Sequence, residues 1–196
     1  MIRIAVVGDI GSGKSHIAKL FGYPVFSADD EVAKLYRESR KCFNKLKKVL
    51  PKYIVTFPVK KNVLSQAIIE NNYNLKKIVS IIHPEIRIKI KKFIKKNKNK
   101  KIVILDIPLL LENRTNKRKD ILIFVDARKK EINKRLKKRD NINIKILKKF
   151  KKLQLPVELK KKKSNYIIKN NFKNNSIKKN VKIILKKILL NARSNT

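Results

Sequence analysis

The chain has 196 residues with a hydrophobic fraction of 42%, which is enough to build the core of one domain. Its 53 Lys and Arg outnumber its 14 Asp and Glu, giving a formal net charge of +39. The single cysteine, Cys42, excludes an intramolecular disulfide and a cysteine-based metal cluster, so we expect a reducing, cytoplasmic setting. The longest apolar run, 102–111, is about half as long as a membrane-spanning helix, so we expect no membrane association.

The positive charge by itself suggests a nucleic-acid-binding protein, because phosphate backbones attract such a surface. However, the basic residues are spread along the whole chain, Lys greatly exceeds Arg, and no DNA- or RNA-binding motif is present. Lys, Asn and Ile are all read from A/T-rich codons, so the bias is typical of a genome's base composition. A specific nucleic-acid partner is therefore not expected, and this class is kept only as an alternative.

Short apolar runs alternate with longer amphipathic segments, a pattern typical of an α/β fold around a mostly parallel sheet. The run Ile102–Leu105 is apolar throughout, as expected for a strand that is covered on both faces. We expect strands at Ile2–Val7, Pro24–Ser27, Ile102–Ile107, Ile121–Val125 and Tyr166–Lys169. We expect helices at Lys14–Phe21, Asp30–Tyr36, Glu85–Lys95 and Lys129–Arg139, and a final amphipathic helix whose apolar stripe runs from Ile177 to Ile188.

Two long segments interrupt this alternation. The stretch between Tyr36 and Lys95 has no strand pattern and is interpreted as a helical insertion. A highly charged segment, 137–163, is interpreted as helical as well, and it comes just before the last strand. We therefore expect a single domain with a core at about 1–36, 97–135 and 164–196, an insertion at about 37–96, and a second helical segment at about 136–163.

Residues 8–15 read Gly-Asp-Ile-Gly-Ser-Gly-Lys-Ser and fit the phosphate-binding pattern G-x-x-x-x-G-K-[ST], between a β-rich run and a helix pattern. Glycines let backbone N–H groups converge on an anion, and the helix N-terminus adds partial positive charge. Lys14 would reach the β- and γ-phosphates, and the Ser15 hydroxyl would ligate Mg²⁺. The motif predicts binding of ATP with Mg²⁺, through Asp9, Ile10, Gly11, Ser12, Gly13, Lys14, Ser15 and His16.

A phosphate-binding loop alone does not identify a substrate. A GTPase would need N-K-x-D to recognise guanine, and the nearest string, 116–120, has its acid one place too late. The chain is also short for a motor ATPase. These observations favour a small-molecule kinase.

Several further segments, in order along the chain, resemble the dephospho-CoA kinase family. Ser27-Ala28-Asp29 resembles the family's Asp-Ala-Asp, 82–87 its His-Pro segment, and Pro108-Leu109-Leu110-Leu111-Glu112 its Pro-Leu-Leu-Phe-Glu. Arg135 and Arg139-Asp140 match the start of the family's lid. Gln154, the lysines around Lys160, and Tyr166–Asn170 resemble its C-terminal segment.

The resemblance implies that ATP phosphorylates the ribose 3′-hydroxyl of dephospho-CoA, giving CoA and ADP. It implies a three-layer P-loop kinase fold with a parallel five-stranded sheet. The segment at about 37–96 would then be a helical substrate-binding insertion, and the segment at about 136–163 a helical lid. The protein would bind ATP and dephospho-CoA. We expect it to be a monomer. The alternative is another P-loop kinase, such as a nucleoside monophosphate kinase.

Two acidic residues have two interpretations each. Asp29 follows a strand that we expect to lie beside the phosphate-loop strand. It either orients or deprotonates the acceptor hydroxyl, as the resemblance implies, or caps the helix that follows. Asp106 ends an apolar strand and either meets Mg²⁺ through water or is a polar residue at a strand end.

The remaining candidates depend more heavily on the resemblance. Arg139 would clamp the triphosphate when the lid closes, with Arg135 one helical turn earlier. Arg87 would grip an acidic group of the substrate, whereas His83, before Pro84 at an expected helix start, is either structural or a substrate contact. Pro108, Leu109 and Glu112 would lie at the substrate, unless Glu112 only caps its loop; Asn170 would lie on the adenine side.

The sequence departs from the family's pattern at four places. Asp9 stands where the family usually has Gly, and its side chain can point away from the bound phosphate. Ser27 replaces the first acid of Asp-Ala-Asp, Lys61 replaces an Arg of the insertion, and Ser164-Asn165 replaces Ala-Asp. The phosphate loop, the Mg²⁺ hydroxyl and the candidate base are all retained.

Overall fold

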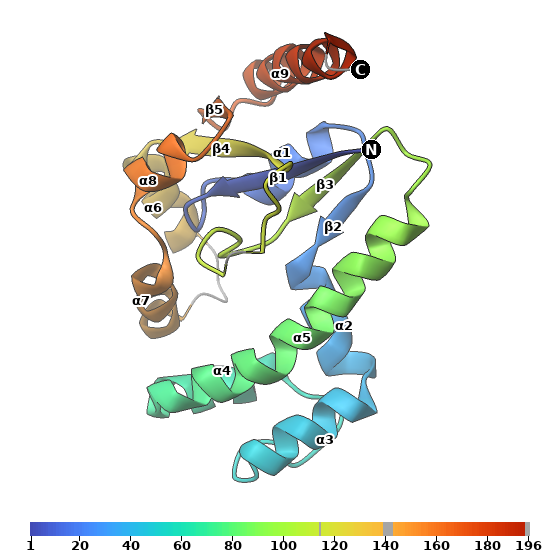
Figure 1. The fold of residues 1–196 in the computed structure, drawn as a ribbon. Coiled ribbons are helices and arrows are strands. Elements are labelled where there is room, and N and C mark those ends of the chain that lie inside the picture. Colours follow the sequence, from blue (N-terminus) through green and yellow to red (C-terminus); the bar gives the residue numbers. More distant parts are fainter. Residues whose placement is uncertain (114, 139–142, 195–196) are drawn as a thin grey trace. The chain divides into compact units, whose positions relative to one another are not determined.

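The computed structural model describes residues 1–113, 115–138 and 143–194. Within these ranges the chain forms a parallel sheet of five strands in the order β2-β3-β1-β4-β5 (Figure 1). All five expected strands are confirmed to within two residues. Their bounds are β1 Ile2–Gly8, β2 Val25–Ser27, β3 Ile102–Asp106, β4 Ile121–Ala127 and β5 Tyr166–Asn170.

The strand order corrects one expectation. β2, the strand that precedes Asp29, does not lie beside β1, because β3 lies between them and pairs with both. Every residue of β3 is buried, as suits a central strand, whereas β2 has three residues and forms an edge. In this register Ser27 at the end of β2 is the partner of Asp106 at the end of β3.

The chain divides into two compact units. The sheet unit comprises 1–27, 97–142 and 150–196, and the helical unit comprises 28–96 and 143–149. The first boundary falls at Ser27 rather than near residue 36, so the helix after β2 groups with the insertion helices. The sheet unit holds α1 Lys14–Leu20, α6 Lys129–Lys137, α8 Val157–Lys162 and α9 Asn174–Ser194. The helical unit holds α2 Ala28–Glu38, α3 Arg40–Val49, α4 Lys61–Glu70 and α5 Asn72–Lys96. The boundary between residues 149 and 150 falls inside α7, Ile144–Leu153.

Alternate residues of the sheet build the main core of the sheet unit. Ile4, Ile104 and Ile123 are fully buried against α1 and α9. The expected stripe of the last helix is confirmed, since Ile177, Val181, Ile184 and Ile188 of α9 all lie in this cluster. Helix α8 contacts β1 as well. The buried face of α1 and the strands that lead to the phosphate-binding loop therefore share one apolar core.

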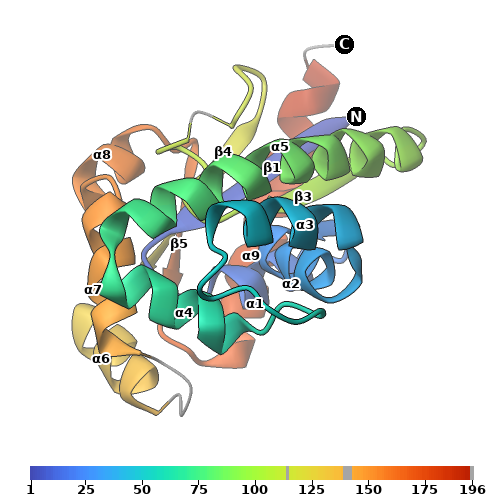
Figure 2. The same cartoon turned by 90° about the horizontal axis from the view of Figure 1, so that it is seen from below.

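In the helical unit, α3 and α4 both pack against α5, as Figure 2 also shows. Helix α5 begins at Asn72, so the expected helix start at Pro84 is wrong, and Pro84 lies inside the helix. The buried residues Ile78, Ile82, Ile86 and Ile90 recur every four residues on both sides of the proline. This continuous apolar stripe holds the helix together across a position where proline removes one backbone hydrogen bond.

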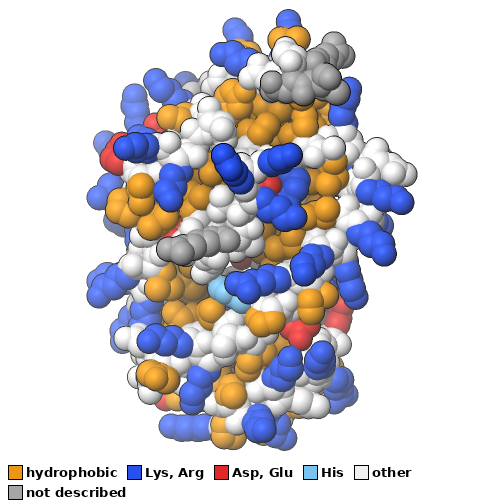
Figure 3. All heavy atoms as spheres, in the orientation of Figure 1, with side chains coloured by type: hydrophobic (Ala, Val, Ile, Leu, Met, Phe, Trp, Pro, Cys, Tyr) orange, Lys and Arg blue, Asp and Glu red, His pale blue; other side chains and the backbone are white. Residues whose placement is uncertain are grey.

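Lys and Arg side chains are distributed over the face seen in Figure 3, interrupted by apolar side chains rather than gathered into one patch. In the described ranges, no helix is both long and apolar enough to span a bilayer. Cys42 is buried, and this burial raises the pKa of its thiol to about 11. The thiol is therefore protonated and unreactive at neutral pH.

Candidate active site

The phosphate-binding loop joins β1 to α1, as the motif predicts. Gly11 and Gly13 have φ angles of +87° and +92°, in the left-handed region that favours glycine. A Cβ on Gly13 would lie 2.5 Å from Asn170 Nδ2, so only glycine fits against this neighbour. The backbone N–H of Ser12 donates to the carbonyl of Asp9 at 3.1 Å and closes the turn. The loop is therefore a compact cradle of backbone groups.

Asn170, at the end of β5, contacts this loop although it lies far from it in the sequence. Its Nδ2 donates to the Ser12 carbonyl at 2.7 Å, and its Oδ1 accepts from the Phe172 backbone N–H at 2.8 Å. The side chain is buried, with an exposed fraction of only 4%. The residue expected on the adenine side thus has its amide engaged with the loop backbone. The neighbouring Ser12 Oγ is buried without a hydrogen-bond partner among the described residues.

Two lysines converge on Asp9. Lys14 Nζ donates to the Asp9 backbone carbonyl at 2.8 Å, and Lys160 Nζ donates to Asp9 Oδ1 at 2.6 Å. The Lys160 side chain is 2% exposed and comes from α8. The acid at position 9, where the family usually has Gly, therefore balances a buried ammonium. Sequence reasoning noted Lys160 only within the family-like C-terminal segment and missed this contact.

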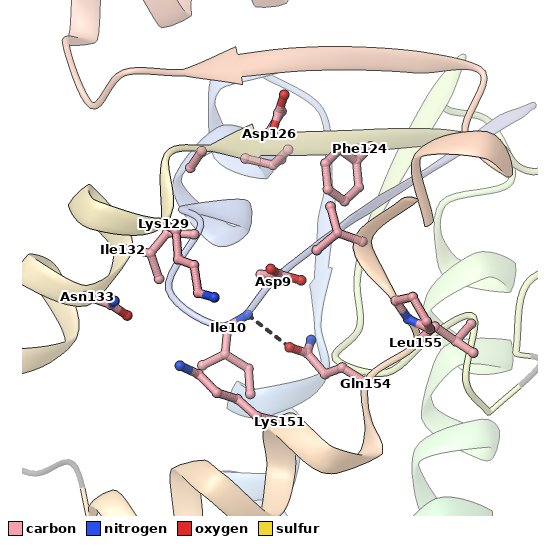
Figure 4. Close-up of a pocket in the computed structure, with 14 residues that line it drawn as sticks. Asp9, Ile10, Phe124, Asp126, Lys129, Ile132, Asn133, Lys151, Gln154 and Leu155 are labelled. Carbon is pink, nitrogen blue, oxygen red and sulfur yellow. Dashed lines mark hydrogen bonds between the residues drawn. The ribbon is translucent and has the colours of Figure 1, made fainter. Parts of the chain in front are cut away.

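Behind the loop, on the side of β4 and α6, lies a cavity of about 430 Å³. Asp9 and Ile10 line it together with the segment that follows α7 (Figure 4). Within it, the Ile10 N–H donates to Gln154 Oε1 at 3.4 Å, so this amide faces Gln154 rather than the cradle. Sequence reasoning assigned no role to Gln154; its position in the family-like C-terminal segment was the available signal.

The segment after β3 lies near the same end of the sheet. Asp106 is buried, at the end of β3. Pro108 follows, and Leu109 has a φ of +54°, an uncommon conformation for a branched residue. Glu112 Oε1 accepts the Leu155 backbone N–H at 2.9 Å, so one oxygen of this carboxylate contacts the chain between α7 and α8. This contact links the segment after β3 to the short connection between α7 and α8.

The first turn of α1 carries Ser15 and His16, both exposed. His16 Nε2 lies 3.0 Å from Asn174 Oδ1, at the start of α9. The Arg135 guanidinium stacks over the Phe172 ring at 4.5 Å and joins α6 to the chain after β5. Arg139, expected to clamp the triphosphate, lies outside the described residues.

The helical unit carries the other candidates. Asp29 lies inside the first turn of α2, which begins at Ala28, so the interpretation of Asp29 as the helix cap is wrong. A carboxylate in a first helical turn still interacts favourably with the helix dipole. His83 and Arg87 are one turn apart on α5. Burial, and then the Arg87 charge, lower the pKa of His83, so its imidazole is neutral at pH 7.

Comparison with known proteins decides the family. A sequence model of dephospho-CoA kinase matches residues 2–176. The chain belongs to the dephospho-CoA kinase family. The dephospho-CoA kinase of Wolbachia sp. subsp. Brugia malayi is 34% identical over 194 residues, which cover 96% of this chain and 99% of that protein.

Solved structures show the same fold. The crystal structure of TT1252 from Thermus thermophilus has a TM-score of 0.77 at 27% identity, covering 95% of this chain and 97% of that one. Dephospho-CoA kinase from Campylobacter jejuni, at 23% identity, has a TM-score of 0.64 over 95% of this chain and 96% of that one, and shares its fold. The predicted α/β P-loop kinase fold with a parallel five-stranded sheet is thus confirmed.

One departure from the family's pattern has a direct structural explanation. Asn165 stands where dephospho-CoA kinases commonly have Asp. Its Oδ1 accepts the Leu122 backbone N–H at 2.8 Å, and its own N–H donates to the Leu122 carbonyl at 2.9 Å. Only an acceptor oxygen is needed at this point, so the amide replaces the acid without losing the contact.

Proposed function

We propose that this chain transfers the γ-phosphoryl group of ATP to the ribose 3′-hydroxyl of dephospho-CoA, giving CoA and ADP. The observation that carries the proposal is the glycine cradle between β1 and α1 in a chain matched by the dephospho-CoA kinase model over residues 2–176. In phosphoryl transfer the protein mainly positions the reactants and neutralises charge.

The cradle would hold the polyphosphate of ATP. The left-handed conformations of Gly11 and Gly13 would let neighbouring N–H groups turn toward a bound phosphate, and the N-terminus of α1 would add its dipole. Lys14, now on the Asp9 carbonyl, has a flexible stem and would move its ammonium to the β- and γ-phosphates. Arg139, at the start of the proposed lid, would add a second positive group.

A magnesium ion would fit the oxygen donors at this end of the sheet. The Ser15 hydroxyl follows Lys14 directly, and Asp106 supplies a carboxylate at the end of β3. Among the described residues, no cluster of three or more His, Cys, Asp or Glu is placed to hold a metal. This fits Mg²⁺, which keeps several waters and binds through few protein ligands and the phosphates themselves. When bound, the ion would neutralise charge on the β- and γ-phosphates.

Asp29 would act on the acceptor hydroxyl. Helix α2 begins directly after β2, so Asp29 follows the carboxyl end of a parallel strand, where ligands of α/β sheets bind. Its carboxylate is exposed and would orient or deprotonate the ribose 3′-hydroxyl. Arg87 would hold an acidic group of dephospho-CoA, and His83, Pro108, Leu109 and Glu112 are the other proposed substrate contacts.

The test is a coupled assay for ADP with Mg²⁺, ATP and each of four acceptors: dephospho-CoA, AMP, CMP and shikimate. We expect turnover with dephospho-CoA to exceed that with every other acceptor by at least about a hundredfold in kcat/KM, since a site built to bind one acceptor discriminates strongly against others. A preference for AMP or CMP would replace the proposal with a nucleoside monophosphate kinase.

Replacing Asp29 tests the acceptor side. Asp29→Asn keeps the side-chain shape and removes the charge and the basic oxygen, so kcat should fall by roughly 10²–10⁴-fold, the usual contribution of a positioned general base. The Kd for ATP, measured by calorimetry, should stay within about twofold. Asp30→Asn, the exposed neighbour in the same turn, is the matched control. A full kcat in Asp29→Asn would remove Asp29 from the mechanism.

A further inference from the structure

Asp9 holds two ammonium groups at once, and each uses a different atom. Lys14 takes the backbone carbonyl and Lys160 takes the carboxylate. The two lysines also line one small hollow at the end of β1, together with Gly8. One of these lysines belongs to the phosphate-binding motif, so the second lies close to the place where a polyphosphate would be neutralised.

The burial of the two partners is unequal. The Lys160 side chain is 2% exposed, whereas the Asp9 side chain is 36% exposed. A buried ammonium is strongly unfavourable without an anionic partner. Lys160 therefore requires an anionic partner both with and without bound nucleotide. A half-exposed carboxylate can instead turn into water at little cost. The acid is therefore the exchangeable member of this pair, and the lysine is the fixed one.

We propose that Lys160 is a second phosphate-contacting lysine of the site, and that Asp9 is its counterion until the polyphosphate of the nucleotide replaces it. This inference rests on the proposed function, because it adds a residue to the same phosphate site. The incoming ligand is an anion with several acceptor oxygens, which satisfies the buried ammonium as well as the carboxylate does. Release of Asp9 also keeps its negative charge away from the transferred phosphoryl group.

A competing explanation is a purely structural clamp, in which the Asp9–Lys160 pair ties α8 to the phosphate loop. The two explanations differ in the sign of one effect. If Asp9 competes with phosphate, removing its charge tightens nucleotide binding, whereas removing the Lys160 charge weakens it. If the pair is a clamp, either change loosens the loop, and both weaken binding.

The experiment measures the Kd of a non-hydrolysable ATP analogue by calorimetry, without acceptor, for wild type, Asp9→Asn, Lys160→Met and Lys160→Arg. A charge-assisted hydrogen bond is worth roughly a ten- to hundredfold change in binding, so Lys160→Met should raise the Kd by about that factor. Asp9→Asn should lower it several-fold. Lys160→Arg should recover much of the loss, because it restores the charge. Lys162→Met removes an exposed charge from the same helix and should leave the Kd unchanged.

Weaker or unchanged binding in Asp9→Asn would overturn the inference and leave the clamp. If Lys160→Met does not fold, as judged by circular dichroism, the sign of the Asp9→Asn effect decides by itself. The proposed function fails differently: wild-type protein would then bind no ATP analogue, or would bind it and not phosphorylate dephospho-CoA. Wild-type activity combined with parallel losses in Asp9→Asn and Lys160→Met would refute only the role of Lys160.

Discussion

Single residues decide the chemistry proposed for this chain, and replacing Lys14 tests it most simply. Lys14→Ala removes the motif ammonium from the phosphates while leaving the backbone cradle and the apolar side of α1, Ile17 and Ala18, in place. We expect kcat/KM in the coupled assay to fall by at least about a thousandfold, with an unchanged circular dichroism spectrum. Lys19→Ala, at the exposed end of the same helix, should keep full activity. An active Lys14→Ala variant would refute the phosphate-loop assignment.

His83 gives a pH dependence of stability whose sign follows from its environment. Burial and Arg87 lower the pKa of its imidazole below the ordinary 6.5. Well above pH 6.5 the imidazole is neutral in both folded and unfolded chains, and the full stability is present. As the pH falls below 6.5, the unfolded chain takes up the proton more readily, so the free energy of unfolding decreases.

Urea unfolding of wild type and His83→Gln between pH 5 and 8 measures this effect. The wild-type free energy of unfolding should fall more steeply below pH 6.5 than that of His83→Gln, which cannot titrate there. Equal slopes for the two proteins would contradict the assigned environment of His83.

Residue roles were only partly predictable from the sequence. The glycines and Lys14 stand at fixed spacing, and the structure forms the loop that this spacing predicts. Gln154 and Lys160 contact the loop from 144 and 151 residues away, and no local pattern carries that information. The cap role of Asp29 failed because helix α2 begins at Ala28, two residues earlier than its apolar pattern indicates.

At the scale of elements, α5 organises the helical unit through one face. Ile82 is 5% exposed on that face, and Ile88 is 48% exposed on the same helix. Ile82→Ala should cost about 2–5 kcal/mol in the free energy of unfolding, because it leaves a cavity in the buried stripe of α5. Ile88→Ala, the matched control, should cost less than about 0.5 kcal/mol. Equal costs in urea unfolding would mean that the stripe does not carry the packing.

Strands were easier to predict than helices, for a physical reason. The three central strands, β1, β3 and β4, are short apolar runs with most of their residues buried, and such runs stand out in a lysine-rich chain. Helices α2, α3 and α5 of the helical unit each pack against more than one neighbour. The sequence therefore predicts that the insertion is helical, but not where one helix ends and the next begins. Pro84 was misleading, because packing of the stripe outweighs the local preference of proline for a first turn.

At the scale of the whole molecule, the net charge of +39 predicts contacts that are unrelated to catalysis. Binding to heparin or duplex DNA should be detectable by gel shift at about 20 mM salt. It should disappear at about 150 mM salt, where screening and counterion competition remove nonspecific electrostatic binding. Affinity for the ATP analogue should persist at both salt concentrations, because the cradle adds directed hydrogen bonds. Sequence-selective DNA or RNA binding that survives 150 mM salt would instead favour a nucleic-acid-binding role.

The central proposal, transfer of phosphate to one hydroxyl of one acceptor, has a direct measurement. Phosphorus and proton NMR of the product formed from ATP, Mg²⁺ and dephospho-CoA identify both the new phosphate and the ribose carbon that bears it. We expect a single monoester on the 3′-oxygen, in equal amount to the ADP released. ADP without a new phosphate ester, or an ester on any other oxygen, would contradict it.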